Sequence, residues 1–306
     1  MFLSRLKTTS PVTIVFYMLL AVLFCFLPVF QHAIDDLYSH TFFSSTTVFL
    51  LGILLPILQS VGLNNLIYEK DVIKKSSLVV APVFLLLCTP FLSQADAWIV
   101  SFLLIFYLNT IFGCFQKDKP FSLVFNATFL LSTIALFYAD VILLFPLIMV
   151  AFLTYTNLTW RSFIISIIGL ALPILLYWIY SFLFEFPFGF SLPSYSLPAL
   201  TLPSISELTY AELAWYIIVA IIIILSFVEL FFWMYKKSIR SRKSFFIILA
   251  YLLLLVFINF ENNYFLTLTP ITIIVANFFV YSKRTRLTEI LFFLFVIASF
   301  YYRLSI

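Results

Sequence analysis

The placement of the basic residues around long apolar stretches constrains this chain more than any other feature. If the apolar stretches are read as membrane spans and the N-terminus is assigned to the cytoplasm, the connections alternate between the two sides. All but one of the 17 Lys and Arg residues then fall on the cytoplasmic side, and only Arg303 lies outside. Short cytoplasmic loops of membrane proteins carry an excess of Lys and Arg. The pattern therefore predicts both a membrane protein and its orientation.

The composition agrees with a chain whose main solvent is lipid. Of the 306 residues, 64% are hydrophobic and only 10% are charged, whereas soluble domains carry roughly 25% charged residues. The apolar runs are continuous and do not alternate with polar residues, which favours helices over a β-barrel. We therefore predict an all-α, polytopic integral membrane protein that forms a single domain over residues 1–306.

The apolar runs predict about eleven transmembrane helices, with the N-terminus cytoplasmic and the C-terminus outside. The first run is about twenty residues long, which indicates an uncleaved span and not a signal peptide. Together these features predict the inner membrane of a bacterium. The expected spans are 11–30, 45–64, 77–92, 98–114, 121–138, 141–158, 162–184, 211–234, 245–260, 264–281 and 288–302.

One connection differs from the short turns elsewhere. Residues 185–210 are rich in proline and apolar side chains, and the triplets that begin at Ser191, Ser196 and Thr201 each read Ser/Thr-Leu-Pro. Proline favours extended backbone. We expect this segment to be an outward loop that lies along the membrane interface, or a lid over an outer cavity.

The first outward loop holds the residues that most resemble a site. If the loop is helical, His32, Asp36 and His40 share one face, and Asp35 flanks them. Imidazoles and carboxylates can bind a divalent metal or act as a general base. The alternative is that these side chains are simply solvated. Glu261 and Arg303 also lie on the outer side, so Glu261, Arg303, His32 and His40 are candidate substrate-binding residues.

The three cysteines, Cys25, Cys88 and Cys114, lie within or at the ends of predicted spans. Their spacing with the two histidines matches no zinc-binding pattern. We expect them to be small apolar packing residues.

Two resemblances add to these expectations. Residues 125–139, 159–163 and 169–173 resemble a family of uncharacterised bacterial multi-spanning proteins, a likeness that covers most of the chain and implies no activity. The chain is also distantly similar to the C-type glycosyltransferases, polytopic enzymes that use polyprenyl-phosphate sugars. Their catalytic acid lies in the first outward loop, so this resemblance implies a catalytic role for Asp35 and Asp36.

The chain departs from the glycosyltransferase pattern in two respects. It lacks a large outward domain, and its outer side carries few cations to stabilise a lipid phosphate. A divalent metal at Asp35 and Asp36 would be the implied cofactor of the enzyme reading.

Three functions therefore stay open. The sparse polar residues favour a non-catalytic subunit or scaffold of an envelope complex. The alternatives are a C-type-like glycosyltransferase at the outer face and a lipid or amphiphile transporter. The expected partners are membrane lipids and other envelope membrane proteins. The basic residues sit in short clusters beside apolar runs, which argues against a nucleic-acid partner.

Overall fold

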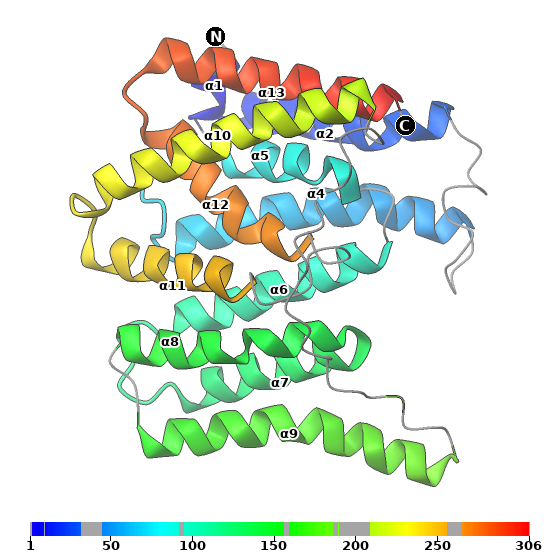
Figure 1. Ribbon diagram of the computed structural model, residues 1–306, viewed down its shortest axis with the longest axis vertical. Helices are drawn as coiled ribbons and strands as arrows, with labels where there is room; N and C mark the ends of the chain where they lie inside the picture. Colours follow the sequence, from blue (N-terminus) through cyan, green and yellow to red (C-terminus); the bar gives the residue numbers. More distant parts are fainter. Residues whose placement is uncertain are drawn as a thin grey trace. The chain divides into compact units, whose positions relative to one another are not determined.

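A computed structural model describes residues 2–8, 10–31, 45–91, 95–155, 159–185, 189, 209–255 and 265–305. Helices account for 86% of these residues, and no strand occurs among them (Figure 1). The all-α prediction is thus confirmed for the described part of the chain. The helices are α1 (Phe2–Leu6), α2 (Pro11–Gln31), α4 (Ser45–Glu69), α5 (Val80–Leu87), η1 (Thr89–Phe91), α6 (Ala95–Gly113), α7 (Phe121–Phe137), η2 (Ala139–Leu144), α8 (Phe145–Tyr155), α9 (Trp160–Leu183), α10 (Tyr210–Met234), α11 (Ile239–Leu255), α12 (Phe265–Tyr281) and α13 (Thr285–Ser305).

Three of the described helices, α9, α10 and α13, are long and apolar enough to cross a membrane. Several shorter helices are also apolar, among them most of α2, α6, α7 and α12. This set of helices indicates a membrane protein. At least one helix overlaps each of the predicted apolar stretches, whereas the number of crossings and the orientation stay predictions.

The segment predicted as a span over 77–92 forms a much shorter helix than expected. Helix α5 has eight residues and is therefore about 12 Å long, against about 30 Å for the hydrocarbon core of a bilayer. Pro90 helps to explain where it stops, because proline has no N–H to donate to the carbonyl of Leu86, four residues earlier. The chain continues as the 3₁₀ turn η1, and the Thr89 hydroxyl donates a hydrogen bond to Leu86 O at 2.5 Å.

The hairpin expected at Ala139 and Asp140 is also built differently. Helix α7 ends at Phe137, and the chain then forms the 3₁₀ helix η2 before α8 begins at Phe145. Pro146 lies in the first turn of α8, where its missing N–H would have no helical partner. The turn between these two helices is therefore six residues of tight helix and not a two-residue loop.

The chain divides into two compact units, and whether they act as one domain stays a prediction. Unit 1 comprises Met1–Ser101, Leu202–Lys237 and Leu268–Ile306, and unit 2 comprises Phe102–Thr201 and Ser238–Thr267.

In unit 1, helices α2, α5 and α13 share an apolar core. Side chains from each helix line one small void there, including Leu20 of α2, Leu86 of α5 and Phe292 of α13. All eight residues of α5 are buried. Polar groups inside this unit join one helix to another: Trp215 Nε1 of α10 donates to Ser299 Oγ of α13 at 3.0 Å.

In unit 2, helices α7 and α9 lie side by side (Figure 1). Gly169 of α9 faces Thr128 of α7 so closely that it has no room for a larger residue. Next to this contact, the Ser132 hydroxyl donates a hydrogen bond to Leu170 O at 2.6 Å. Small residues let membrane helices approach each other in this way.

Candidate functional site

Most residues that the sequence nominated for a site lie outside the described residues. These are His32, Asp35, Asp36, His40 and Glu261, together with most of the 185–210 segment. Their roles stay predictions. Of the nominated residues, the structure describes Arg303.

Arg303 lies in the last turn of α13 and is buried, with 3% of its surface exposed. Its guanidinium carbon is 5.9 Å from the centre of the Phe24 ring, which belongs to α2. Phe24 lies about two turns before the end of α2, and the acidic segment of the first predicted outward loop follows α2 in the sequence. Arg303 is about 27 Å along the helix axis from Thr285, where α13 begins.

The opposite end of α13 belongs to a cluster of cations, which we call the basic end of unit 1. Contacts tie its members together: the backbone N–H of Lys74 donates to Tyr281 Oη at 3.1 Å, and Leu78 N–H donates to Leu6 O at 2.9 Å. The cluster comes from four turns or helix ends and contains Lys7, Lys74, Lys75, Lys236, Lys237, Lys283 and Arg284.

This arrangement is the one that the predicted topology requires. Each of these basic residues was assigned to the cytoplasmic side from its position in the sequence, and the folded chain brings them to one end of unit 1. Arg303, the residue assigned to the outer side, lies near the other end of α13. The side of the membrane that the basic end faces stays a prediction.

Lys237 is the most deeply placed lysine of the basic end. Its ammonium group donates a hydrogen bond to Asn277 Oδ1 and lies 5.1 Å from the centre of the Tyr281 ring. Burial lowers the pKa of Lys237 to about 7, because the interior disfavours the charged form. The amide oxygen and the aromatic face partly replace the water that this ammonium group loses.

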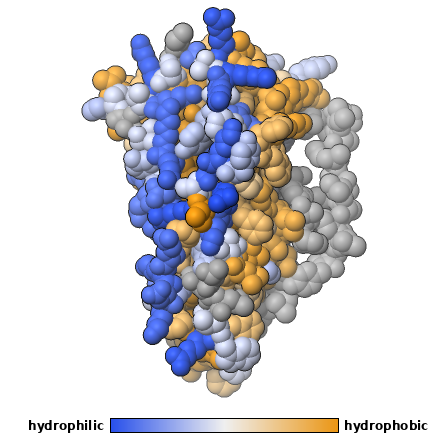
Figure 2. All heavy atoms as spheres, turned by 90° about the vertical axis from the view of Figure 1, so that its left-hand side faces the viewer, coloured by the Kyte–Doolittle hydropathy of each residue, from blue (hydrophilic) through white to orange (hydrophobic). Residues whose placement is uncertain are grey.

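Lys236 and Lys283 both lie over the ring of a single tryptophan. Lys236 Nζ is 5.1 Å and Lys283 Nζ is 5.3 Å from the centre of the Trp233 ring. Lys236 Nζ is also 5.3 Å from the centre of the Tyr235 ring. Both lysines are exposed. Figure 2 looks onto the side of the molecule where the turn between α12 and α13 lies in Figure 1, and it shows hydrophilic residues gathered there.

Unit 2 shows a similar convergence of helix ends that the sequence assigned to the cytoplasm. The guanidinium carbon of Arg240, near the start of α11, is 5.4 Å from the Phe115 ring, which follows α6. The Phe115 ring in turn contacts the ring of Tyr155 at the end of α8, with 5.3 Å between centres. Lys117 and Lys119 are exposed in the same connection after α6.

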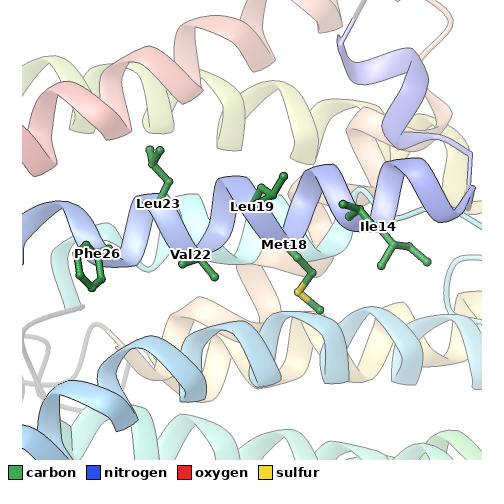
Figure 3. A pocket seen from close by; sticks show the side chains of 7 residues that line it. Ile14, Met18, Leu19, Val22, Leu23 and Phe26 are labelled. Carbon is green, nitrogen blue, oxygen red and sulfur yellow. The ribbon is translucent and has the colours of Figure 1, made fainter.

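A second feature of unit 1 is an apolar groove of about 710 Å³ along α2 (Figure 3). Ile14, Val15, Met18, Leu19, Val22, Leu23 and Phe26 line it. No polar side chain is among these lining residues, so the groove suits a hydrocarbon chain or an apolar helix, and it offers no group for acid–base chemistry.

The cysteines are confirmed as buried thiols without disulfides. Within the described ranges, no three His, Cys, Asp or Glu residues come close enough together to hold a metal ion.

The sequence assigned Lys236, Lys237 and Lys283 only to the cytoplasmic side of the membrane. It missed the burial of Lys237 and the pairing of Lys236 and Lys283 over one indole. The available signal was the run Trp233-Met-Tyr-Lys-Lys237, which sets two aromatic residues directly before two lysines. What that run could not reveal is that Lys283, in a distant turn, shares the same tryptophan.

Comparison with known proteins returned no match: no protein-family model fits the chain, and neither the curated proteins nor the solved structures contain a significant relative.

Proposed function

We propose that this protein is a non-catalytic subunit or scaffold of a cell-envelope complex in the bacterial inner membrane. The observation that carries the proposal is the apolar groove along α2. Leu19 is 67% exposed and Val15 is 60% exposed. Within a membrane, such an apolar row faces either lipid or another helix, and we propose that side chains of a partner membrane helix fill this groove.

The polar residues of the interior support the same reading. Buried polar groups of unit 1 bond one helix to another: Gln59 Nε2 donates to Trp98 O at 2.7 Å, and the hydroxyls of Tyr17 and Ser60 form a hydrogen bond. Interhelical hydrogen bonds of this kind hold membrane helices together. These side chains therefore have a structural role in place of a catalytic one.

Photo-crosslinking in cells tests the proposal. A photoreactive amino acid at Leu19, in the groove, is expected to give a discrete protein adduct. The matched control is Leu176 of α9, which is similarly apolar and 52% exposed but lies outside the groove. Adducts with lipid alone at both positions would overturn the proposed role as a subunit.

A second candidate, a glycosyltransferase that acts on a polyprenyl-phosphate substrate at the outer face, is supported by the position of Arg303. A guanidinium group is well suited to binding phosphate. Arg303 lies over the ring of Phe24 in α2, and α2 precedes the segment that holds Asp35 and Asp36 in the sequence. The test is the double variant Asp35→Asn, Asp36→Asn, which is expected to lose glycan transfer without losing membrane abundance. Unchanged transfer would exclude this candidate.

A further inference from the structure

The two lysines over Trp233 form an unusual pair, because both carry the same charge. Each ammonium group lies within the range of a cation–π interaction with the indole. The two nitrogens are therefore at most about 10 Å apart. Among the described residues, no carboxylate lies within salt-bridge distance of Lys236 or Lys283.

An apolar stripe on α10 leads directly to this pair. Ile217, Ile221, Ile224, Val228, Phe231 and Tyr235 are all exposed, and their spacing places them on one face of the helix. From Ile217 to Tyr235 the stripe is about 27 Å long. It ends at the Tyr235 ring, 5.3 Å from Lys236 Nζ.

The stripe and the lysine pair match the two parts of one kind of molecule. Hydrocarbon chains can lie along the stripe, and an anionic group at their end would then meet two ammonium groups. Trp and Tyr favour the boundary between the hydrocarbon and the headgroups, and Trp233 and Tyr235 occupy that boundary on α10. Basic pockets between membrane helices are known to hold anionic lipid headgroups.

We propose that Lys236 and Lys283, together with Trp233, form a binding site for the phosphate headgroup of an anionic phospholipid, whose acyl chains lie along the exposed stripe of α10. The phosphodiester accepts hydrogen bonds from both ammonium groups, which also relieves their mutual repulsion. The site requires that α10 crosses the membrane, and it is independent of whether the protein is a subunit or an enzyme.

Native mass spectrometry of the full chain in neutral detergent tests this site. The probes are phosphatidylglycerol, phosphatidylcholine and inorganic phosphate. Phosphatidylglycerol is expected to bind most tightly. Because each lysine near an anionic group contributes about fivefold in affinity, the double variant Lys236→Gln, Lys283→Gln is expected to bind it about 30-fold more weakly.

Two matched variants separate a specific site from general surface charge. Lys117→Gln, Lys119→Gln removes two exposed lysines of another predicted cytoplasmic connection and is expected to bind phosphatidylglycerol like the unaltered protein. Lys236→Arg, Lys283→Arg keeps both cations and is expected to retain binding. An equal loss in the Lys117 and Lys119 variant would overturn the proposal.

The probes decide the source of the phosphate. Equal binding of phosphatidylcholine would overturn the requirement for an anionic lipid, and equally tight binding of inorganic phosphate would replace the lipid site with a free-phosphate site. A second measurement uses the unaltered protein alone, in case the glutamine variant does not fold. Phosphatidylglycerol should slow the acylation of Lys236 and Lys283 by an amine reagent but not that of Lys117, and equal rates at all three would contradict the site.

Discussion

The contact between Gly169 and Thr128 makes a sharp prediction about the packing of α9 against α7. A Cβ added at Gly169 would lie 2.0 Å from Thr128 Oγ1 and 3.0 Å from Phe125 O. Ordinary contact begins at 3.4 Å, so the hydroxyl and the new methyl group must separate by about 1.4 Å. Thr128 Oγ1 cannot move freely, because it donates to Val124 O and Phe125 O, each at 3.0 Å.

The substitution Gly169→Ala therefore overpacks this interface. Overpacking typically costs about 1–3 kcal/mol, against which alanine recovers up to about 1 kcal/mol of helix propensity. We expect the free energy of unfolding to fall by about 1–2 kcal/mol. Adding Thr128→Ala removes the closest clash and should restore most of that loss, which gives a coupling energy of at least about 1 kcal/mol in the double-mutant cycle.

Unfolding by SDS titration in mixed micelles measures these differences. Gly62→Ala is the control, because a Cβ at Gly62 would meet no atom within 4 Å; it should be neutral or slightly stabilising. A Gly169→Ala variant as stable as the unaltered chain, or a Thr128→Ala change that adds to the loss, would contradict tight packing at this contact.

Three further predictions follow from single sites. The pKa of Lys237 in the folded chain, about 7, lies below the ordinary 10.5, so the unfolded state binds more protons between these two values. The free energy of unfolding should therefore rise as the pH increases from about 7 to 10.5. Lys237→Met should abolish that rise in SDS titrations at each pH, and an identical rise in the variant would refute the assignment. Thr209 and Glu212 form a capping box at the start of α10. Thr209→Ala should therefore lower the free energy of unfolding by about 1 kcal/mol in the same assay, whereas Thr209→Ser should lower it little. Equal losses in the two variants would show that the hydroxyl is not the cause. An impermeant thiol reagent should label a cysteine at exposed Gly189 in intact cells and one at exposed Lys119 only after lysis; the reverse pattern would invert the predicted orientation.

The sequence was sufficient to locate the helices because hydropathy changes abruptly at their ends. The predicted spans 211–234 and 264–281 differ by one residue at the start from α10 and α12. The capping box at Thr209 is also readable from the sequence, since the Thr-x-x-Glu spacing depends only on neighbours in the chain.

Features that depend on distant residues were out of reach. Length and burial of α5 could not be read from an apolar run, because a wholly enclosed helix and a lipid-facing helix have the same composition. The shared tryptophan of Lys236 and Lys283 requires that two turns far apart in the chain meet. The predicted acids Asp35 and Asp36 lie outside the described residues, so the outer site rests on the sequence and on the position of Arg303.

The enclosure of α5 has a consequence for how the chain is made. Eight apolar residues are too few for stable insertion by themselves, yet all of α5 is covered in the folded chain, in part by α13, which is synthesised about two hundred residues later. During translation α5 must therefore wait in an incomplete helix bundle until α13 arrives. A nascent chain that stops before α13 would leave part of α5 uncovered, so the synthesis of α13 completes the enclosure of this segment.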